Sequence, residues 1–377
     1  MKVNMLCVGG KISFNQFKAI LDESSLNSRI TLQNANLMPR QPLLSLIKDS
    51  EEKNLHISLS GKGISAGDLI DIISMIRHPR TSMDIADIDN YRIGDIPAIA
   101  KAMGPRSFDI SINSHGINHN TAPRLISVLA ETPASLYLSS LTIMTAAAVE
   151  TTLSAIGGRA FSLEIDAKAS TPQRTVDTLR KVHSNTSINL TNADVFSTNY
   201  MPLIADAIDN KNCTVNLSAT RFNLKQLKTF IHRFSNSVKI QIDSAHLYHP
   251  REIPEIMSLL GSRNISLNFN GRQLAVDPSD GDLLKKFIEH AKTKDTITIN
   301  TMQYPPLSYI LPIISSTAHT NLSLIYNGSQ ITDTEAHGNV VVRGIHAATP
   351  STMITVNSVG VTNFRLENYL EIVRAAG

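Results

Sequence analysis

A short pattern of apolar and polar residues recurs along the whole chain and limits the folds that this sequence can adopt. Its clearest copy is Ser187–Val195, in which two apolar residues flank a polar one, a small polar residue follows, and an apolar residue ends the copy. Further copies lie near both ends, at Ile57–Ile64 and Ile354–Val361. A pattern that repeats every 20 to 50 residues is typical of proteins that stack copies of one structural unit.

The second apolar residue of each copy can be used as its anchor. The anchors are Cys7, Leu32, Leu59, Ile88, Ile112, Leu138, Ile165, Leu190, Leu217, Ile242, Phe269, Ile299, Tyr326 and Val356. They span 349 residues (356 − 7) in thirteen intervals, which gives about 14 repeats of about 27 residues. At two places the sequence allows a second choice of anchor, because Ile85 can replace Ile88 and Leu163 can replace Ile165.

Each repeat is expected to contain a strand followed by a helix. Around the anchors, apolar and polar residues alternate with the two-residue period of a strand, as in Ile240–Ile242. The segment after Ile64 has the spacing of an amphipathic helix, with apolar residues from Leu69 to Ile76. Repeated strand–helix units give parallel strands, because each helix is a crossover. Residues 339–343 are an expected exception, since three consecutive valines favour an extended segment.

Two arrangements of such units are considered. Eight units can form a closed barrel, whereas fourteen units of this short period are expected to remain open. We therefore predict an α/β fold with a single domain, residues 1–377, that forms an open curved solenoid. Its parallel sheet is expected to line the concave face, and its helices to cover the convex face.

The pattern resembles the leucine-rich repeat, of the helix-bearing ribonuclease-inhibitor type. Copies such as Asn189–Thr191 and Asn216–Ser218 are also similar to the repeats in leucine-rich effectors of intracellular bacterial pathogens. The resemblance covers essentially the whole chain. It implies protein binding through the concave face, with possible secretion of the protein into a host cell without a cleaved signal peptide. The family places an asparagine three residues after the anchor, and none of the fourteen copies has one.

The composition argues against several classes of protein. The formal net charge of +3 is small for 377 residues and argues against a dedicated nucleic-acid binder. No apolar segment is long enough for a signal peptide or a membrane span, so synthesis in the cytoplasm is expected. The two cysteines, Cys7 and Cys213, are expected to be buried thiols. The sequence shows no pattern of metal ligands, and no cofactor is expected.

The candidate binding surface consists of polar residues beside the anchors, which are expected to point into the concave face. The candidate partner-binding residues are Asp87, Asp89, Asp109, Tyr137, Glu164, Asp166, Asn189, Asn216, Gln241 and Asp243. Acidic residues dominate the middle of this set, and only Arg29 and Lys239 are expected beside them as countercharges. The set indicates either a docking surface for a basic protein or solvated charges that keep the sheet soluble. Tyr137 is expected either to contact the partner or to pack against a neighbouring repeat.

Two further hypotheses come from other classes of function. The pairs Asp87/Asp89 and Glu164/Asp166 suggest a sugar-binding or sugar-hydrolysing protein. Without a recognisable cleft or nucleophile, however, the chain is expected not to be an enzyme. The third hypothesis is a self-assembling module, since an open solenoid leaves a free strand edge at each end through which copies can pair into homo-oligomers.

Overall fold

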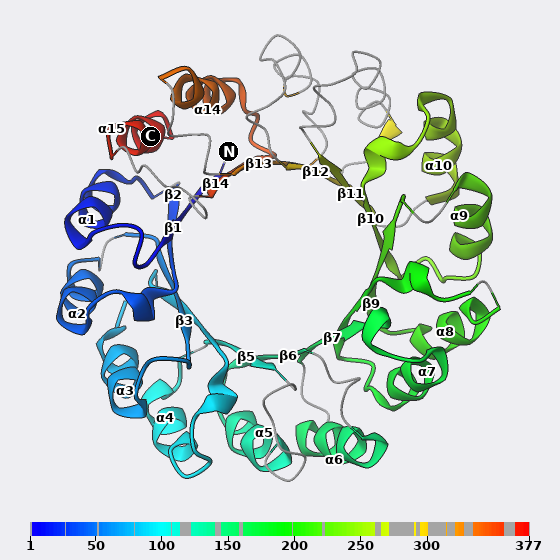
Figure 1. The fold of residues 1–377 in the computed structure, drawn as a ribbon, viewed down its shortest axis with the longest axis horizontal. Coiled ribbons are helices and arrows are strands. Elements are labelled where there is room, and N and C mark those ends of the chain that lie inside the picture. The colour runs from blue at the N-terminus through cyan, green and yellow to red at the C-terminus, as the bar shows by residue number, and fades with distance from the viewer. Residues whose placement is uncertain are drawn as a thin grey trace.

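Fourteen parallel strands form one closed ring in the computed structural model, and helices surround this ring on the outside (Figure 1). The structure describes residues 2–113, 122–139, 145–157, 161–260, 265–270, 290–291, 295–300, 314, 321–327, 335–357 and 366–376, apart from 27, 51–52, 79, 107, 198 and 221–222. The predicted alternation of strands and helices is thus confirmed for the described residues.

The strands are short and follow one another in the order of the chain. They are β1 (Lys2–Val8), β2 (Ser28–Gln33), β3 (Leu55–Ser60), β4 (Ser82–Ala86), β5 (Asp109–Asn113), β6 (Ser135–Ser139), β7 (Ser162–Asp166), β8 (Ser187–Thr191), β9 (Asn212–Ser218), β10 (Lys239–Asp243), β11 (Ile265–Asn270), β12 (Thr296–Asn300), β13 (Asn321–Asn327) and β14 (Thr352–Asn357).

Each of the described helices follows a strand along the chain. They are α1 (Phe14–Glu23), α2 (Arg40–Asp49), α3 (Ala66–Met75), α4 (Ile96–Met103), α5 (Ala122–Ala130), α6 (Ala146–Ile156), α7 (Pro172–Lys181), α8 (Met201–Ile208), α9 (Leu224–Ile231), α10 (Ile253–Leu260), α14 (Glu335–Ala347) and α15 (Leu366–Ala375). Within the described residues, no helix is long and apolar enough to cross a membrane.

The predicted open solenoid is wrong, because the first and last strands pair with each other. Asn4 of β1 lies opposite Thr355 of β14, and Met5 lies opposite Val356. Outside the strands, Arg374 of α15 is 2.6 Å from Glu23 of α1. Every strand of the ring therefore has two neighbours, and the free edges required by the self-assembly hypothesis are absent from the described sheet.

Closure follows from the different widths of the two layers. Neighbouring strands are about 4.8 Å apart, packed helices are about 8 to 10 Å apart, and the helix layer lies about 10 Å outside the strands. Each unit is therefore wider on the outside and turns relative to the previous one. With these dimensions, the turn reaches a full circle after about 12 to 20 units. Fourteen units lie within that range, so the short period that argued against closure permits it.

The strands are also tilted, as closure of a sheet requires. Partner residues in neighbouring strands are 25 or 26 positions apart, or 30 at β11–β12 and β13–β14. These register offsets add up to 337 positions, whereas the paired residues of β1 and β14 are 351 positions apart. Over one circuit of the ring, the strand register therefore shifts by 14 residues. One residue of displacement per strand is also the ratio in the eight-stranded (β/α)₈ barrel, where the strands tilt by about 36°.

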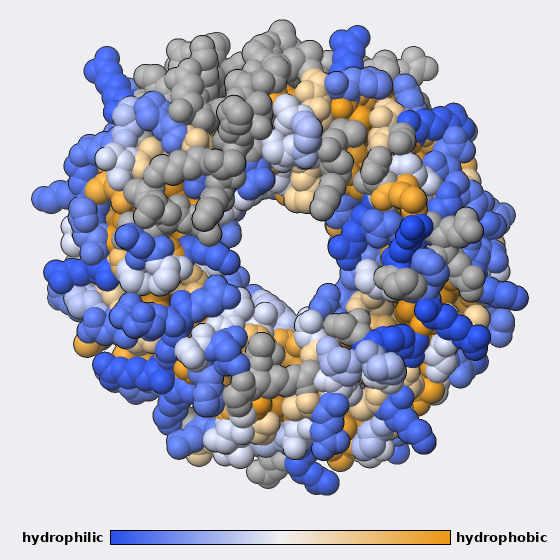
Figure 2. Space-filling model, turned by 180° about the vertical axis from the view of Figure 1, so that it is seen from behind, coloured by the Kyte–Doolittle hydropathy of each residue, from blue (hydrophilic) through white to orange (hydrophobic). Residues whose placement is uncertain are grey.

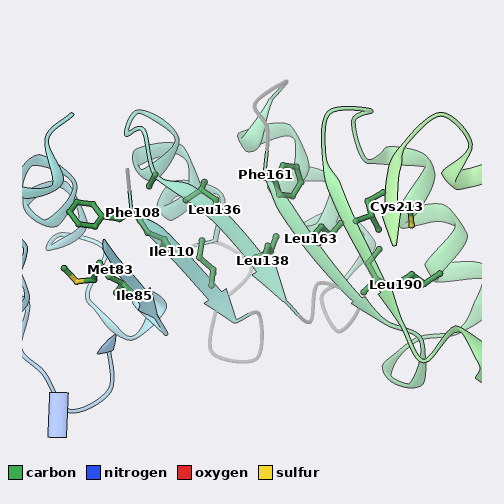
Figure 3. Close-up of a cluster of buried hydrophobic side chains, with 14 of the residues drawn as sticks. Met83, Ile85, Phe108, Ile110, Leu136, Leu138, Phe161, Leu163, Leu190 and Cys213 are labelled. Atoms are coloured by element: carbon green, nitrogen blue, oxygen red, sulfur yellow. The ribbon is translucent and has the colours of Figure 1, made fainter. Parts of the chain in front are cut away.

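The core lies between the strands and the helices, and the anchors form its inner layer. All predicted anchors except Ile88 lie in strands, and each of these is at most 2% exposed. Figure 3 shows part of this layer, from Met83 and Ile85 in β4 to Cys213 in β9. The two thiols are buried as predicted, and burial raises the pKa of each to about 12. Core packing therefore fixes which face of each strand points toward the helices.

The alternative anchor Ile85 is correct in the fourth repeat. Ile85 lies opposite Leu59 of β3 and is 1% exposed. Ile88 is also buried but belongs to a short 3₁₀ helix, Ile88–Asn90, that follows the strand. Both isoleucines face the core, so hydrophobicity alone could not distinguish them. In the seventh repeat, both Leu163 and Ile165 lie in β7 and pair with β8, so either choice identifies the strand.

Residues 339–343 are helical, contrary to the extended segment predicted from the three valines. They belong to α14. Val341 and Ile345 of this helix are buried, and Gly344 faces Tyr326 so closely that an added Cβ would lie 2.6 Å from the phenol oxygen. Packing against the ring thus outweighs the modest local preference of valine for strands.

The turns after the strands alternate between two kinds in several neighbouring repeats. Gly61 follows β3 and donates its backbone N–H to the carbonyl of Ala86 at 2.8 Å. The next repeat places Asp87 in the left-handed region, with φ of 53°, before its 3₁₀ helix. A Cβ on Gly61 would lie only 2.4 Å from the Asp87 carbonyl oxygen. The absence of a side chain at Gly61 allows the two turns to pack together.

The closed seam can be tested with a disulfide. A variant with Asn4→Cys and Thr355→Cys should form an intramolecular disulfide on mild oxidation, because neighbouring strands hold their Cα atoms within the range that a disulfide requires. The measurement is gel mobility without reductant, combined with mass spectrometry. The matched pair Asn4→Cys and Thr298→Cys places the second thiol on β12, two strands from β14, and should not cross-link. Equal cross-linking of both pairs would contradict the seam.

The close approach at Gly61 predicts opposite effects for two glycine substitutions. Gly61→Ala should lower the free energy of unfolding by about 1 to 3 kcal/mol, because the methyl group must displace backbone. Gly67→Ala in α3 should raise it by up to about 1 kcal/mol, because its Cβ meets only the Ser65 Oγ, at 3.9 Å. Urea unfolding measures both values. A Gly61→Ala protein as stable as the parent would exclude the proposed steric role.

Candidate functional site

The inner faces of the strands form a wall of polar side chains around a central opening. Because the anchors point outward to the helices, the residues that alternate with them along each strand point inward. In β8 and β9 these residues include Asn189 and Asn216, both half-buried. Figure 2 shows the opening through the middle of the molecule, with hydrophilic residues along much of its margin. What the sequence predicted as a concave face is therefore the wall of a channel.

The strand number determines how much room this channel offers. Fourteen strands about 4.8 Å apart and tilted by about 36° give a backbone ring about 26 Å across. Inward side chains of about 5 to 6 Å on each side leave a channel about 15 Å wide. An α-helix with its side chains is about 10 to 12 Å wide, whereas a small folded domain is about 30 Å across. The channel has room for one extended or helical segment, but a folded domain cannot enter it.

Two of the candidate residues, Asp87 and Asp89, do not lie on the strand face as predicted. Strand β4 ends at Ala86, so both belong to the turn that follows. Asp87 accepts a hydrogen bond from the Ser60 hydroxyl at 2.8 Å and lies 3.5 Å from the Lys62 ammonium group. The correct anchor, Ile85, instead places Asp84 on the wall. Asp84 is a functional candidate absent from the predicted set, because an anchor at Ile88 assigns residue 84 to the outward face of the strand.

Asp109, Tyr137 and Glu164 lie on the wall as predicted. Asp109 is exposed on β5 and is the register partner of Asp84. The Tyr137 hydroxyl donates a hydrogen bond to Glu164 on the adjacent strand, β7. Burial, followed by the contact with Glu164, raises the pKa of Tyr137 above its usual range. Tyr137 thus contacts a neighbouring repeat, which was one of the two predicted alternatives, while remaining half-buried on the channel wall.

The remaining candidates lie toward the carboxyl ends of their strands or in mid-strand. Asp166 accepts hydrogen bonds from the backbone N–H of Lys168 and from the side chain of Asn192, at 2.9 and 2.8 Å. Asp243 accepts from Gln241 and from Asn268 on the next strand, at 3.3 and 2.5 Å. Each carboxylate therefore accepts one hydrogen bond from its own repeat and one from the next repeat. Gln241 also lines a cavity of about 330 Å³ near the start of β10.

The carboxylate pairs suggested for sugar chemistry have different surroundings from those expected. Asp87 and Asp89 are not on one strand face, as described above. Glu164 and Asp166 do share a strand, but Glu164 contacts a tyrosine hydroxyl and Asp166 is held by its turn. No described feature places a sugar-sized cleft between the members of either pair. The geometry therefore gives the sugar hypothesis no specific support.

A second group of wall residues forms a hydrogen-bonded centre on β3 and β4. His56 Nδ1 lies 2.8 Å from Ser82 Oγ, and His56 Nε2 lies 2.5 Å from a carboxylate oxygen of Asp84. Ser58 donates its hydroxyl to the other oxygen of Asp84 at 2.8 Å. His56 is only 9% exposed, and Ser82 is half-buried.

The sequence contained part of the signal for this centre. His56 stands between buried strand residues, and Ser82 and Asp84 are two positions apart, so they share a face. Knowledge of the β3–β4 register was required to bring them together, because His56 lies opposite Ser82. The register in turn depends on choosing Ile85 as the anchor.

Within the described residues, no group of three or more histidine, cysteine or acidic side chains is arranged to hold a metal ion. The Cys7 and Cys213 thiols are buried in the core, away from the channel, and their raised pKa values disfavour the reactive thiolate. The chemistry available on the described wall is therefore that of carboxylates, hydroxyls, amides, the cations Arg29 and Lys239, and the imidazole of His56.

Comparisons with known proteins assign no family. No family model matches the chain, and no curated protein matches it. Among solved structures, the chain is similar to the yeast Rad7 and Elc1 complex, with 9% identity, 91% of this chain and 78% of that chain covered, and a TM-score of 0.41.

Two other solved structures are enzymes by name. The truncated 3-deoxy-D-arabino-heptulosonate 7-phosphate synthase from Thermotoga maritima has 14% identity, covers 58% of this chain and 85% of its own, and has a TM-score of 0.26. A sugar phosphate isomerase/epimerase from Parabacteroides distasonis has 7% identity, 70% and 92% coverage, and a TM-score of 0.25. Likenesses with TM-scores below 0.5 transfer no activity or partner to this chain.

The expectation that the chain is not an enzyme rested on the lack of a recognisable cleft or nucleophile, and this reasoning is wrong. The closed α/β ring encloses a channel and brings Ser82, His56 and Asp84 into contact. The resemblance to bacterial leucine-rich effectors is also corrected, since the closed ring departs from the open solenoid on which it rested. What holds of the repeat resemblance is the succession of parallel strand–helix units.

The raised pKa of Tyr137 predicts a pH effect on stability. In the unfolded chain a tyrosine ionises near pH 10, whereas the folded protein keeps the Tyr137 phenol protonated. Stability that this phenol contributes below pH 10 is therefore lost as the pH rises above 10. Tyr137→Phe should make the loss between pH 9 and 11 smaller, by no more than about 1 kcal/mol, because solvent screens a half-buried group.

Urea unfolding at several pH values measures this difference. Tyr200→Phe is the matched control, because Tyr200 is 38% exposed and precedes α8 on the outside of the ring. Its stability should depend on pH as that of the parent does. If both variants showed the same pH dependence as the parent, Tyr137 would not be the coupled group.

Proposed function

We propose that the ring binds an extended, basic segment of a partner protein inside its channel. The observation that carries this proposal is the closed inner wall, on which acidic and hydrogen-bonding side chains from many strands face one narrow volume. The proposal keeps the concave face as the binding surface, but its occupant must now enter the opening rather than dock against an exposed sheet.

The charge on the wall supports a basic occupant. Asp84 and Asp109 are register partners on β4 and β5, and Glu164 follows on β7. Asp166 and Asp243 add carboxylates at the strand ends. A concave surface of one charge sign focuses its electrostatic field and attracts counter-ions and charged ligands. Of the cations Arg29 and Lys239, Lys239 lies on β10, outside the β4–β7 arc, whereas Arg29 on β2 reaches Ser82 at the start of β4.

The width and the amide side chains support an extended segment. A channel about 15 Å wide excludes a folded domain but admits a single chain. Asn189, Asn216 and Gln241 each carry both a donor and an acceptor, as does every peptide unit of an extended chain. A segment that passes along the channel can therefore exchange hydrogen bonds with water for hydrogen bonds with the wall at little net cost.

The first test is binding of a fluorescent twelve-residue lysine-rich peptide, measured by anisotropy at low and raised salt. The parent should bind it, and added salt should weaken binding because exposed charges are screened. The variant Asp109→Asn, Glu164→Gln and Asp243→Asn should bind at least about tenfold more weakly, which corresponds to about 1.4 kcal/mol.

A matched control makes the same charge change on the outer helices, with Asp177→Asn, Glu255→Gln and Glu367→Gln. It should bind the peptide as the parent does. A further control is the same peptide carrying a folded domain at both ends, which cannot be threaded through a closed ring. Equal losses in both variants, or equal binding of the blocked peptide, would show that the channel wall is not the binding site.

A further inference from the structure

The centre formed by Ser82, His56 and Asp84 has the order of contacts required of an activated nucleophile. Ser82 and Asp84 are two positions apart on β4, so their side chains leave the strand on the same side. His56 on β3 lies opposite Ser82 and presents one ring nitrogen to each of them, at 2.8 and 2.5 Å. A hydroxyl beside a base, with the base oriented by a carboxylate, is the arrangement by which serine becomes a nucleophile.

We propose that this centre hydrolyses an acyl ester or amide bond of a molecule that enters the channel. Ser82 is the nucleophile, His56 the general base and then general acid, and Asp84 a positioning residue for the imidazole. The assignment follows from contacts and roles rather than from sequence order, because such centres occur on unrelated folds with different chain orders.

The acylation step balances with the groups present. When His56 Nε2–H donates to Asp84, Nδ1 can accept the Ser82 hydroxyl proton as Oγ forms a bond to the substrate carbonyl carbon. Collapse of the tetrahedral intermediate breaks the bond to the leaving oxygen or nitrogen, which takes the proton from the imidazolium. Water then attacks the acyl-serine in the same manner, releasing the acid and restoring the Ser82 hydroxyl.

Neighbouring side chains support both the charge and the geometry of this centre. Arg29 on β2 donates to Ser82 Oγ at 3.5 Å, so a guanidinium lies beside the nucleophile. A positive group next to the reacting centre favours the negative charge that develops on the substrate oxygen. Ser58 donates to the second oxygen of Asp84, which restricts rotation of that carboxylate. His56 is largely shielded from solvent, whereas Ser82 is half-buried and faces the channel.

The inference uses the channel but does not depend on a basic occupant. A peptide could bind to the acidic wall without being cleaved, and a neutral ester could react at Ser82 without binding to the acidic residues. The two proposals can therefore fail separately. Peptide anisotropy reports the first, and covalent labelling reports the second.

The experiment uses a fluorophosphonate probe on the full chain, because this reagent phosphonylates an activated serine and loses fluoride. The labelled residue is identified by peptide mass spectrometry, and release of p-nitrophenol from p-nitrophenyl acetate is followed in parallel. In the parent protein, Ser82 should be labelled and nitrophenol released. Ser82→Ala should abolish both, and His56→Gln should slow labelling by about 100-fold or more.

Two further variants separate chemistry from folding. Ser187→Ala removes another serine that begins a strand of the wall, β8, and should label at the parental rate. Asp84→Asn should slow labelling and change the pH profile of its rate, because the imidazole is no longer held in the tautomer that accepts the Ser82 proton. Circular dichroism and urea unfolding confirm that each variant is folded.

Labelling confined to Ser82, and dependent on His56, supports the proposal. No labelling of the folded parent, labelling at another serine, or undiminished labelling in folded His56→Gln would each overturn it. In those cases the three side chains are a hydrogen-bonded cross-strand group that stabilises β3 and β4.

Discussion

The difference in width between a helix and a strand is the constraint on which this structure depends. Each repeat adds about 4.8 Å to the inner layer and about 8 to 10 Å to the outer layer, so every repeat adds curvature. Fourteen repeats turn that curvature into a complete circle, and the displacement of 14 residues around the ring shows that the strands tilt as they close. The channel, and the pairing of each described strand on both sides, follow from this closure.

The sequence was sufficient to predict the unit but not the assembly. The anchors are deeply buried, so the two-residue alternation of apolar and polar side chains gave a reliable signal. Closure of the ring could not be predicted in this way. It depends on small rotations between neighbouring units, and the pattern of apolar and polar residues does not encode these rotations separately. At α14, Val341 and Ile345 gain burial in a helix, and this tertiary contribution exceeded the local preference used in the prediction.

One ambiguous residue determined how much of the candidate site could be found. With Ile88 as the anchor, the wall appeared to contain Asp87; with Ile85, it contains Asp84. Three residues separate the two choices, and this odd shift exchanges the inner and outer faces of the strand. The position of Asp84 then connects it to His56, and the centre with Ser82 becomes visible only once β3 and β4 are paired. Sites composed of residues from neighbouring strands are therefore sensitive to errors in register that hardly affect a prediction of strands and helices.

The seam between β1 and β14 also has a consequence for how the chain is made. Strand β1 is synthesised before the other described strands of the ring, but one of its two neighbours, β14, is synthesised after all the others. During synthesis, each new unit can add to the previous one through local contacts, while the outer edge of β1 remains unpaired until residues 352–357 have emerged. Closing contacts between residues about 350 positions apart are slow to form, and an unpaired edge is prone to pair with other chains. The growing chain is thus most prone to misassembly just before β14 pairs with β1 and closes the described sheet.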